Sequence, residues 1–273
     1  RNNTRIYCGI IADNTYLYLG TDNGILVYNY RTDKYEQPET DFPTDVRTMA
    51  LQGDTLWIGS LNGLYTYQLN TKKLASLDSK SNGLPHHTIY SIIRTTDNQI
   101  YVGTYNGLCR YIEESGKFEN IPLPVNRSVS NLFVNSLLED TSRQCIWIGM
   151  EGSLFQYTPA TGLMKPIDAF HNNSIKSLAL DGDGNLLAGT DNGLYVYQND
   201  NGTLQHIVHD SRNIQSLTNN IIWNIFADQE QNIWLGTDYG ISLSRYNSAL
   251  QFIPISQITG TGDGNQFYSL FRD

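Results

Sequence analysis

The chain has 273 residues, which is enough for two ordinary domains or for one large all-β or barrel domain. Apolar residues make up 40% and charged residues only 16%, so the chain can form a sizeable core and is not disordered throughout. The formal net charge of −9 argues against nucleic acid and against an anionic membrane surface as direct partners.

The sequence offers no membrane span, signal peptide or cysteine framework. No apolar run approaches the roughly 20 residues that cross a bilayer. The first residues, from Arg1 to Arg5, do not form a signal peptide, so we expect any such signal to have been removed or to lie outside this sequence. The three cysteines, Cys8, Cys109 and Cys145, are far apart and odd in number. We expect them to be small buried hydrophobic residues rather than disulfide partners or zinc ligands.

A short phrase recurs along the whole chain. Its first copy, from Tyr18 to Ile25, reads Tyr-Leu-Gly-Thr-Asp-Asn-Gly-Ile. Six copies align on their leading glycines, which are Gly20, Gly59, Gly103, Gly149, Gly189 and Gly236. The copies lie 39 to 47 residues apart, a period that admits either helical solenoids or four-stranded propeller blades.

The residue types around each glycine favour the propeller. Asn-Gly between two short β-branched and aromatic runs predicts a hairpin with a type I′ turn, and no stretch shows a sustained helical period. A second phrase, such as Val46 to Ala50, precedes each hairpin and predicts the first strand of the unit. A weaker fourth strand follows, as in Lys73 to Leu77. Four antiparallel strands per unit predict an all-β propeller whose first strands line the centre.

We therefore expect a single β-propeller domain over residues 1–273. The expected blades lie near residues 7–40, 46–78, 89–122, 134–167, 175–208 and 222–255, and residues 267–273 would begin a seventh blade. An unclosed ring would expose an apolar blade face, so we expect the sequence to be an excerpt of a longer protein with a seven-bladed ring.

The phrase V-x-S-I-x-x-D…L-W-I-G-T-x-N-G-L-x-x-Y resembles the two-component regulator propeller repeat, and the resemblance runs from Tyr7 to Asp273. It implies the periplasmic sensor region of a hybrid two-component system histidine kinase, an inner-membrane protein found mostly in glycan-degrading Bacteroidetes. It also implies a second propeller, a C-terminal immunoglobulin-like sensor domain and a homodimeric parent. A membrane helix, kinase, receiver and DNA-binding module would follow outside this chain, so the chain itself would not touch the membrane.

On this resemblance the propeller is not an enzyme. It would detect, or relay, the binding of an oligosaccharide and so control glycan-utilisation genes. The copy at Gly149 departs from the family pattern because it lacks the Asn, and we expect its hairpin turn to differ.

The sequence carries no catalytic motif, and we expect no cofactor and no metal. The glycine-rich run from Gly260 to Gly264 precedes a strand rather than a helix, which favours a flexible connection over a phosphate loop. The run from Asp181 to Asn185 is similar to the start of a calcium loop. However, it lacks the distal Glu and falls where a turn between strands is expected.

The sequence contains two pairs of histidines that are close together along the chain. His206 and His209 would lie on opposite faces of a strand, so we expect ordinary surface or packing roles for them. His86 and His87 fall in a loop before a first strand, where a polar binding role is the alternative to a plain surface role.

One position of the first strand varies in chemistry from copy to copy. It is the second residue of each first strand, and it is occupied by Cys8, Arg47, Tyr90, Asn135, Lys176, Trp223 and Tyr268. If the first strands begin at the mouth of the central channel, these side chains encircle it. Aromatic rings stack on sugars, Asn binds hydroxyls, and Arg or Lys pairs with carboxylate or sulfate. The position therefore predicts a saccharide site, with packing between blades as the alternative.

Loops at the same end of the blades would add further ligand-binding side chains, which are Tyr105, Tyr239, Arg127 and Asn131. Two other functions stay open. A propeller lyase or hydrolase acting on a polysaccharide or lactone would need a central His, Tyr or carboxylate cluster, or a metal. The predicted mouth has no His and no carboxylate. A protein-interaction propeller of the WD40 type would carry a Trp-Asp dipeptide, which is absent.

Overall fold

The repeats fold as six four-stranded antiparallel sheets, and in each sheet the strands follow one another in sequence order. The computed structural model describes residues 4–12, 15–38, 40–77, 79–124, 132–170, 173–198, 201–246 and 251–255, which contain almost no helix. The predicted all-β propeller of four-stranded blades is confirmed. Residues 267–273, predicted to begin a seventh blade, lie outside the described residues.

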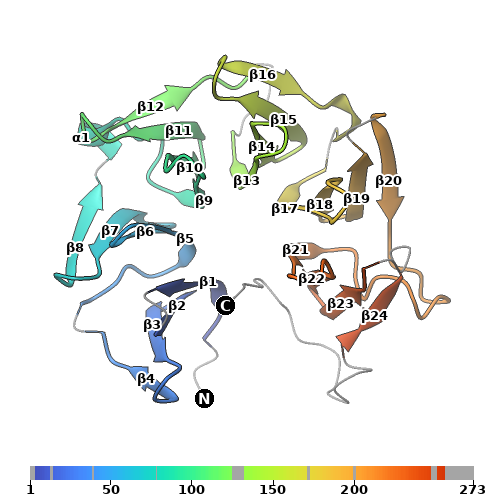
Figure 1. Ribbon diagram of the computed structural model, residues 1–273, viewed down its shortest axis with the longest axis horizontal. Coiled ribbons are helices and arrows are strands. Elements are labelled where there is room, and N and C mark those ends of the chain that lie inside the picture. Colours follow the sequence, from blue (N-terminus) through green and yellow to red (C-terminus); the bar gives the residue numbers. More distant parts are fainter. Residues whose placement is uncertain are drawn as a thin grey trace. The chain divides into compact units, whose positions relative to one another are not determined.

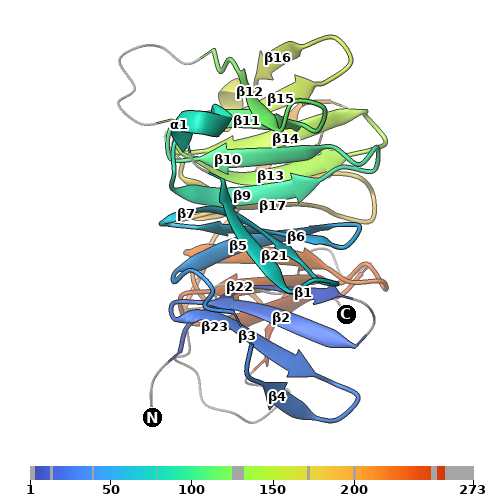
Figure 2. The same ribbon diagram turned by 90° about the vertical axis from the view of Figure 1, so that its left-hand side faces the viewer.

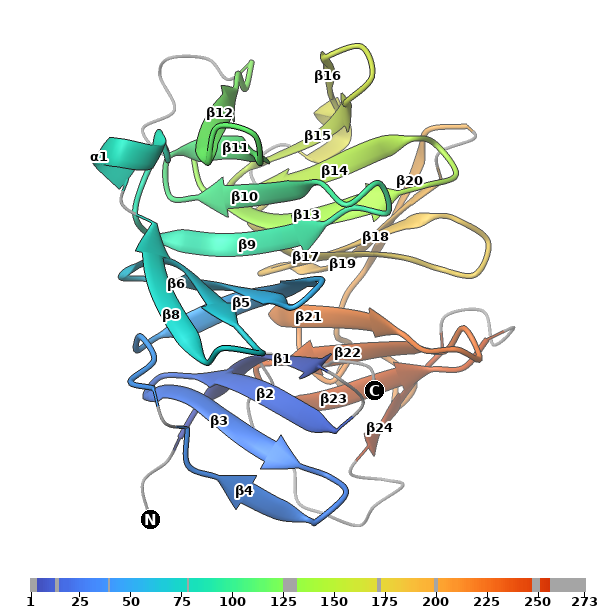
Figure 3. The same ribbon diagram turned by 60° about the vertical axis from the view of Figure 1, so that its left-hand side comes forward.

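The chain divides after Thr141 into two compact units. In the first unit, the first strand of each complete sheet lies on the inner side and the fourth strand on the outer side (Figure 1). The three complete sheets of the first unit lie one above another in the side view of Figure 2. The short helix α1 lies beside β12 (Figure 3), where the Asn82 side-chain amide donates a 2.9 Å hydrogen bond to the Gly116 carbonyl.

The elements of the first unit are β1 (Ile6–Ala12), β2 (Tyr16–Thr21), β3 (Gly24–Asn29), β4 (Lys34–Glu36), β5 (Val46–Gln52), β6 (Thr55–Ser60), β7 (Gly63–Gln68), β8 (Lys73–Leu77), α1 (Ser79–Asn82), β9 (Ile89–Arg94), β10 (Ile100–Thr104), β11 (Gly107–Ile112), β12 (Lys117–Ile121) and β13 (Val134–Asp140). Those of the second unit are β14 (Cys145–Met150), β15 (Ser153–Thr158), β16 (Leu163–Pro166), the 3₁₀ turn η1 (Asp168–Phe170), β17 (Ile175–Leu180), β18 (Leu186–Thr190), β19 (Gly193–Gln198), β20 (Thr203–Ile207), β21 (Ile222–Ala227), β22 (Ile233–Thr237), β23 (Gly240–Ser244) and β24 (Phe252–Pro254).

The apolar cores lie between neighbouring sheets rather than within one. One buried cluster joins Trp57 of β6 to Ile89 of β9 and Phe118 of β12. In the second unit, Leu194 of β19 and Ile222 of β21 share another. Burial of one such side chain contributes roughly 1.5–3 kcal/mol, so neighbouring blades stabilise one another. Among the helices of the described residues, none is long and apolar enough to cross a membrane.

In five of the six repeats the leading glycine is the place where the next sheet packs. A Cβ atom on Gly59 would lie 2.6 Å from Cγ2 of Ile89, the first residue of the next sheet. One on Gly103 would lie 2.6 Å from Cγ1 of Val134. Only glycine leaves room for the β-branched side chain. The same contact recurs in the pairs Gly20–Val46, Gly149–Ile175 and Gly189–Ile222.

In the sheets that begin with β5, β9 and β17, the third residue of the first strand hydrogen-bonds to the next first strand. Ser91 Oγ donates a 3.1 Å hydrogen bond to the Val134 carbonyl, and the Ile225 N–H donates to Ser177 Oγ at 3.0 Å. These bonds satisfy backbone groups that no strand ladder reaches, which explains why small hydroxyl residues recur at this position.

A hydroxyl also closes the hairpin between the second and third strands. Thr104 Oγ1 accepts the Asn106 N–H at 3.0 Å and donates to the Gly107 carbonyl at 2.9 Å. Thr104 pairs with Gly107, so the loop residues are Tyr105 and Asn106, neither of which has a positive φ. The predicted type I′ turn centred on Asn-Gly is wrong. The glycine instead begins the third strand, with φ +117°.

The hairpin after Gly149 differs, as expected. Met150 occupies the position of the closing hydroxyl and pairs with Ser153 across a loop of Glu151 and Gly152. Glycine now holds the second loop place, with φ +76°, where the other copies carry Asn or, in the last one, Tyr239.

Candidate functional site

The variable residue of the first strand is a β-bulge. In β5, Val46 pairs with Ser60 and Thr48 with Gly59, which leaves Arg47 without a partner on β6. The same shift in register isolates Tyr90, Lys176 and Trp223 in their sheets. A bulge releases a residue from the ladder and re-aims its side chain, which is why bulges recur beside functional sites. The blade end at which first strands begin is called the leading end below, and the opposite end the trailing end.

In the first sheet the bulged residue is Tyr7, because Ile6 pairs with Thr21 and Cys8 with Gly20. The sequence-based assignment of Cys8 to the variable position is therefore wrong by one residue. Cys8 occupies the third position instead, and its Sγ lies 3.9 Å from the carbonyl oxygen of Val46 on the next first strand. It thus stands where other sheets have the linking hydroxyl.

Bulged residues of neighbouring sheets touch in the first unit. The Arg47 guanidinium lies over the Tyr7 ring, 3.7 Å from its centroid, and its Nη2 is 3.4 Å from Asp45 Oδ1. Arg47 Nε is buried and has no hydrogen-bond partner among the described residues. Burial raises the pKa of Tyr90; the charge of Arg47 opposes this shift and Tyr105 adds to it. The Arg47 cation thus lies against one bulged ring, that of Tyr7.

A line of packed rings, the aromatic ridge, extends from Tyr90 along the leading end. Ring centroids are 5.7 Å apart for Tyr90 and Phe133, and 4.0 Å for Phe133 and Tyr105. His86 follows at 4.9 Å from Tyr105, and His87 stacks on His86 at 4.3 Å. Tyr105 is 37% exposed. The sequence singled out all of these residues except Phe133, which directly precedes a first strand and so carried a usable signal.

A second group lies at the leading end of the second unit. Lys176 Nζ lies over the Trp223 ring, 4.7 Å from its centroid. The indole Nε1–H of Trp223 donates a 3.0 Å hydrogen bond to Asp238 Oδ1. These three residues form the Lys-Trp-Asp group. The Lys176 cation and the Asp238 carboxylate hold the indole from two directions. A cation–π contact of this kind contributes roughly 0.5–2 kcal/mol.

The other predicted site residues do not join these groups. Asn135 is half-buried on β13. Tyr239 follows Asp238 in the chain but borders a separate hollow. Arg127, Asn131 and Tyr268 lie outside the described residues.

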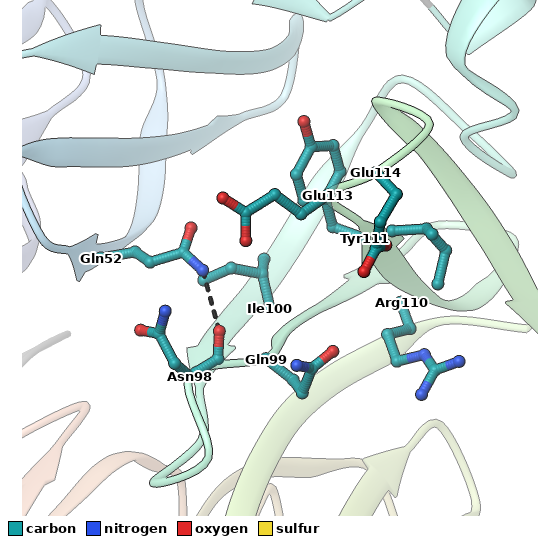
Figure 4. Close-up of a pocket in the computed structure, with 9 residues that line it drawn as sticks. Gln52, Asn98, Gln99, Ile100, Arg110, Tyr111, Glu113 and Glu114 are labelled. Carbon is teal, nitrogen blue, oxygen red and sulfur yellow. Dashed lines mark hydrogen bonds between the residues drawn. The ribbon is translucent and has the colours of Figure 1, made fainter.

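Among the hollows in the described part of the chain are two that the sequence did not predict. One of about 270 Å³ lies at the trailing end of the first unit and is drawn in Figure 4. Its wall includes Gln52, whose Nε2–H donates a 2.8 Å bond to the Asn98 carbonyl, and the carboxylates of Glu113 and Glu114. The other, of about 210 Å³, lies in the second unit beside Tyr239.

The remaining polar motifs have structural roles. Asp181 Oδ1 accepts the N–H groups of Asp183 and Asn185 at 3.0 and 2.8 Å, which makes the predicted turn between strands. His206 stacks on Tyr195 with ring centroids 4.1 Å apart. Within the described residues, no group of three or more His, Cys, Asp or Glu side chains is placed to hold a metal. The run from Gly260 to Gly264 is not among the described residues.

Comparison with known proteins identifies the repeat. The family model of the two component regulator propeller matches residues 83–106 and 216–239. Each stretch runs from the connection before a first strand to the hairpin after the second strand. The resemblance predicted from the six phrases is thus confirmed, and the chain carries two-component regulator propeller repeats.

Its relatives are parts of signalling proteins. Crystal structures of the extracellular domain of BT4673 from B. thetaiotaomicron, described in one as a one component system and in the other as a hybrid two component system, are 83% and 84% identical. Both superpose with a TM-score of 0.88, over 100% of this chain and 37% of theirs. Histidine kinase P4 of Formosa agariphila is 29% identical over 92% of this chain and 19% of its own length.

The extracellular domain of BT3049 from B. thetaiotaomicron, 16% identical with a TM-score of 0.71 over 98% of this chain and 36% of that one, shares the fold. This chain therefore spans little more than a third of its solved relatives. Its regulator propeller repeats are similar to the extracellular domains of hybrid two-component systems.

Proposed function

We propose that this chain is a sensor propeller that binds an oligosaccharide at the leading ends of its blades. The observation that carries the proposal is the bulge in the first strands. It holds Tyr7, Arg47, Tyr90, Lys176 and Trp223 off their ladders, always at the same end of the sheet. A position that served only packing would need no such device in every sheet whose register is described.

The chemistry of these positions suits a sugar. Aromatic rings contact the C–H faces of pyranose rings, and the ridge and Trp223 supply such rings. Charged side chains beside the rings, Arg47 with Asp45 and Lys176 beside Trp223, supply donors and acceptors for hydroxyl groups. Because these side chains already rest on their neighbours, less side-chain entropy is lost when a ligand binds.

The wider role belongs to the same proposal. The chain would form part of the periplasmic sensor region of an inner-membrane hybrid histidine kinase, with a second propeller, a C-terminal sensor domain and a homodimeric parent. Relatives that extend well beyond this chain leave room for such domains. Binding would favour one of two receptor arrangements through its differential affinity, and so switch glycan-utilisation genes.

Calorimetric titration of the full chain with neutral and acidic oligosaccharides tests the proposal. The chain offers a matched pair of variants: the Trp223 indole bonds Asp238 at the leading end, and the Trp234 indole bonds Asp228 Oδ2 at 2.8 Å at the trailing end. Trp223→Leu is expected to weaken binding about tenfold, roughly 1.4 kcal/mol, and Trp234→Leu to leave it within about twofold. Absence of binding by every glycan, or equal losses in both variants, would contradict the proposal.

A further inference from the structure

We propose that the hollow beside Tyr239 is a subsite for one neutral pyranose unit, separate from the Lys-Trp-Asp group. The hollow has a volume of about 210 Å³ and lies at the leading end of the sixth sheet. It is bordered by the connection from residue 209 to residue 218, by the β22–β23 hairpin and by Pro254. The sugar-binding inference stands on the hollow itself; only its place in a receptor rests on the proposed function.

The apolar wall of the hollow is accessible. Tyr239 is 49% exposed and Ile214 is 73% exposed, and with Pro254 they line the same concave surface. Single exposed apolar side chains are ordinary on protein surfaces. Three that converge on one hollow, one of them a tyrosine ring, form a surface on which the C–H face of a sugar can rest.

The polar wall offers one acceptor and one donor that are not used elsewhere. Asp210 Oδ1 accepts the N–H and the Nε–H of Arg212 at 3.0 and 3.2 Å, whereas Oδ2 has no partner among the described residues. Asn213 Oδ1 accepts the Gln215 N–H at 3.0 Å, which orients its Nδ2 amino group and leaves it without a described partner. An acceptor beside a donor is what two neighbouring sugar hydroxyls require.

The connection that carries these groups is held by its own hydrogen bonds. Ser216 Oγ accepts the Asp210 N–H and donates to the Asp210 carbonyl, both at 2.9 Å. The Phe252 N–H donates to the Gln215 carbonyl at 2.9 Å, which ties the connection to β24. A site assembled before the ligand arrives loses less entropy on binding.

Size and charge define the ligand. Pockets for drug-sized molecules measure about 300–1,000 Å³, so this hollow accommodates one sugar ring rather than a chain. The hydrogen bonds from the backbone and side chain of Arg212 lower the pKa of Asp210, so its carboxylate is ionised at neutral pH. An ionised carboxylate accepts hydrogen bonds from sugar hydroxyl groups. Its negative charge repels the carboxylate of a uronate, which points to a neutral pyranose as the ligand.

Saturation-transfer NMR on the full chain tests this subsite with methyl pyranosides of glucose, galactose and mannose, at about 10 mM because one ring binds with millimolar affinity at best. At least one neutral glycoside is expected to receive saturation, and methyl glucuronide much less. Tyr239→Ala should abolish the signal and Asn213→Ala should reduce it severalfold. Tyr246→Ala, which removes a ring that is 46% exposed outside the hollow, should leave it unchanged.

The subsite would be overturned by no saturation of any neutral glycoside, by equal saturation of the glucuronide, or by equal loss in Tyr246→Ala. Persistence of the signal in Tyr239→Ala with loss in Trp223→Leu would place the sugar at the Lys-Trp-Asp group. That result would overturn the subsite and leave the proposed function standing. Glycoside binding that survives in Trp223→Leu, in a chain that binds no oligosaccharide, would support the subsite and contradict the proposed function.

Discussion

In the five sheets whose first-strand register is described, one bulged residue lies at the leading end. Arg47 is an example. It has no partner on β6 because of the bulge, and its guanidinium lies over the Tyr7 ring of the neighbouring sheet. The variation in residue type at this position was visible in the sequence. The bulge itself was not, and this is why Cys8 was assigned to the position that Tyr7 occupies.

At the same scale, His86 of the aromatic ridge is expected to make the folding stability of the chain depend on pH. Burial, followed by the charge of His87, lowers the pKa of His86 below 6.5, and the Thr88 N–H donates to its Nδ1 at 3.1 Å. Below about pH 6.5 the unfolded chain therefore binds more protons than the folded one, so this residue's contribution to stability is present near pH 7 and lost on acidification.

Urea unfolding at pH 7 and pH 5 checks this. His86→Phe keeps a ring in the ridge and removes the titration, so it should lose less stability on acidification than the parent chain. His206→Phe, whose histidine stacks on Tyr195 elsewhere, should match the parent. An identical pH dependence in His86→Phe and parent would show that His86 does not carry the effect.

At the scale of elements, the repeat phrase encodes contacts between blades. The strands were predictable because period, β-branched residues and glycines all agreed. The turn type was not, because Asn-Gly in sequence does not reveal that the loop is Tyr105-Asn106 and that Gly107 already belongs to β11. The closing Thr104 hydroxyl was likewise visible only as a recurrent residue.

The glycine contact predicts a specific double-mutant result. Gly59→Ala should cost about 1–3 kcal/mol, because its Cβ would lie 2.6 Å from both Ile89 Cγ2 and Thr48 Cγ2. Leucine has no Cγ2 methyl group, so an Ile89→Leu background removes one of these two contacts and the same substitution there should cost less. Chemical denaturation of the four proteins gives the coupling free energy, and strictly additive losses would contradict the packing role assigned to this glycine.

The closing hydroxyl predicts a second stability effect. Thr104→Val keeps the shape but leaves the Asn106 N–H and the Gly107 carbonyl without their partner, which should cost about 1–3 kcal/mol. Thr158→Val, at a threonine whose hydroxyl has no partner among the described residues, should change stability much less. Thermal unfolding of both variants decides the matter, and equal melting temperatures would refute the role of the hydroxyl.

At the scale of the whole molecule, the sequence predicted the architecture better than the site. Six similar phrases were enough to predict six sheets, because the copies repeat the same pattern of strand residues around a leading glycine. The aromatic ridge could not be predicted in the same way, because Phe133 and His86 lie in connections that follow no repeat. The hollow beside Tyr239 depends on one connection that occurs only once in the chain.

The most direct test is backbone amide NMR of the full chain, titrated with an oligosaccharide that binds it. We expect chemical-shift changes concentrated at the leading ends of the blades, at Arg47, Tyr90, Tyr105, Lys176 and Trp223. Changes concentrated at the trailing-end hollow, around Gln52, Asn98 and Glu113, would contradict it.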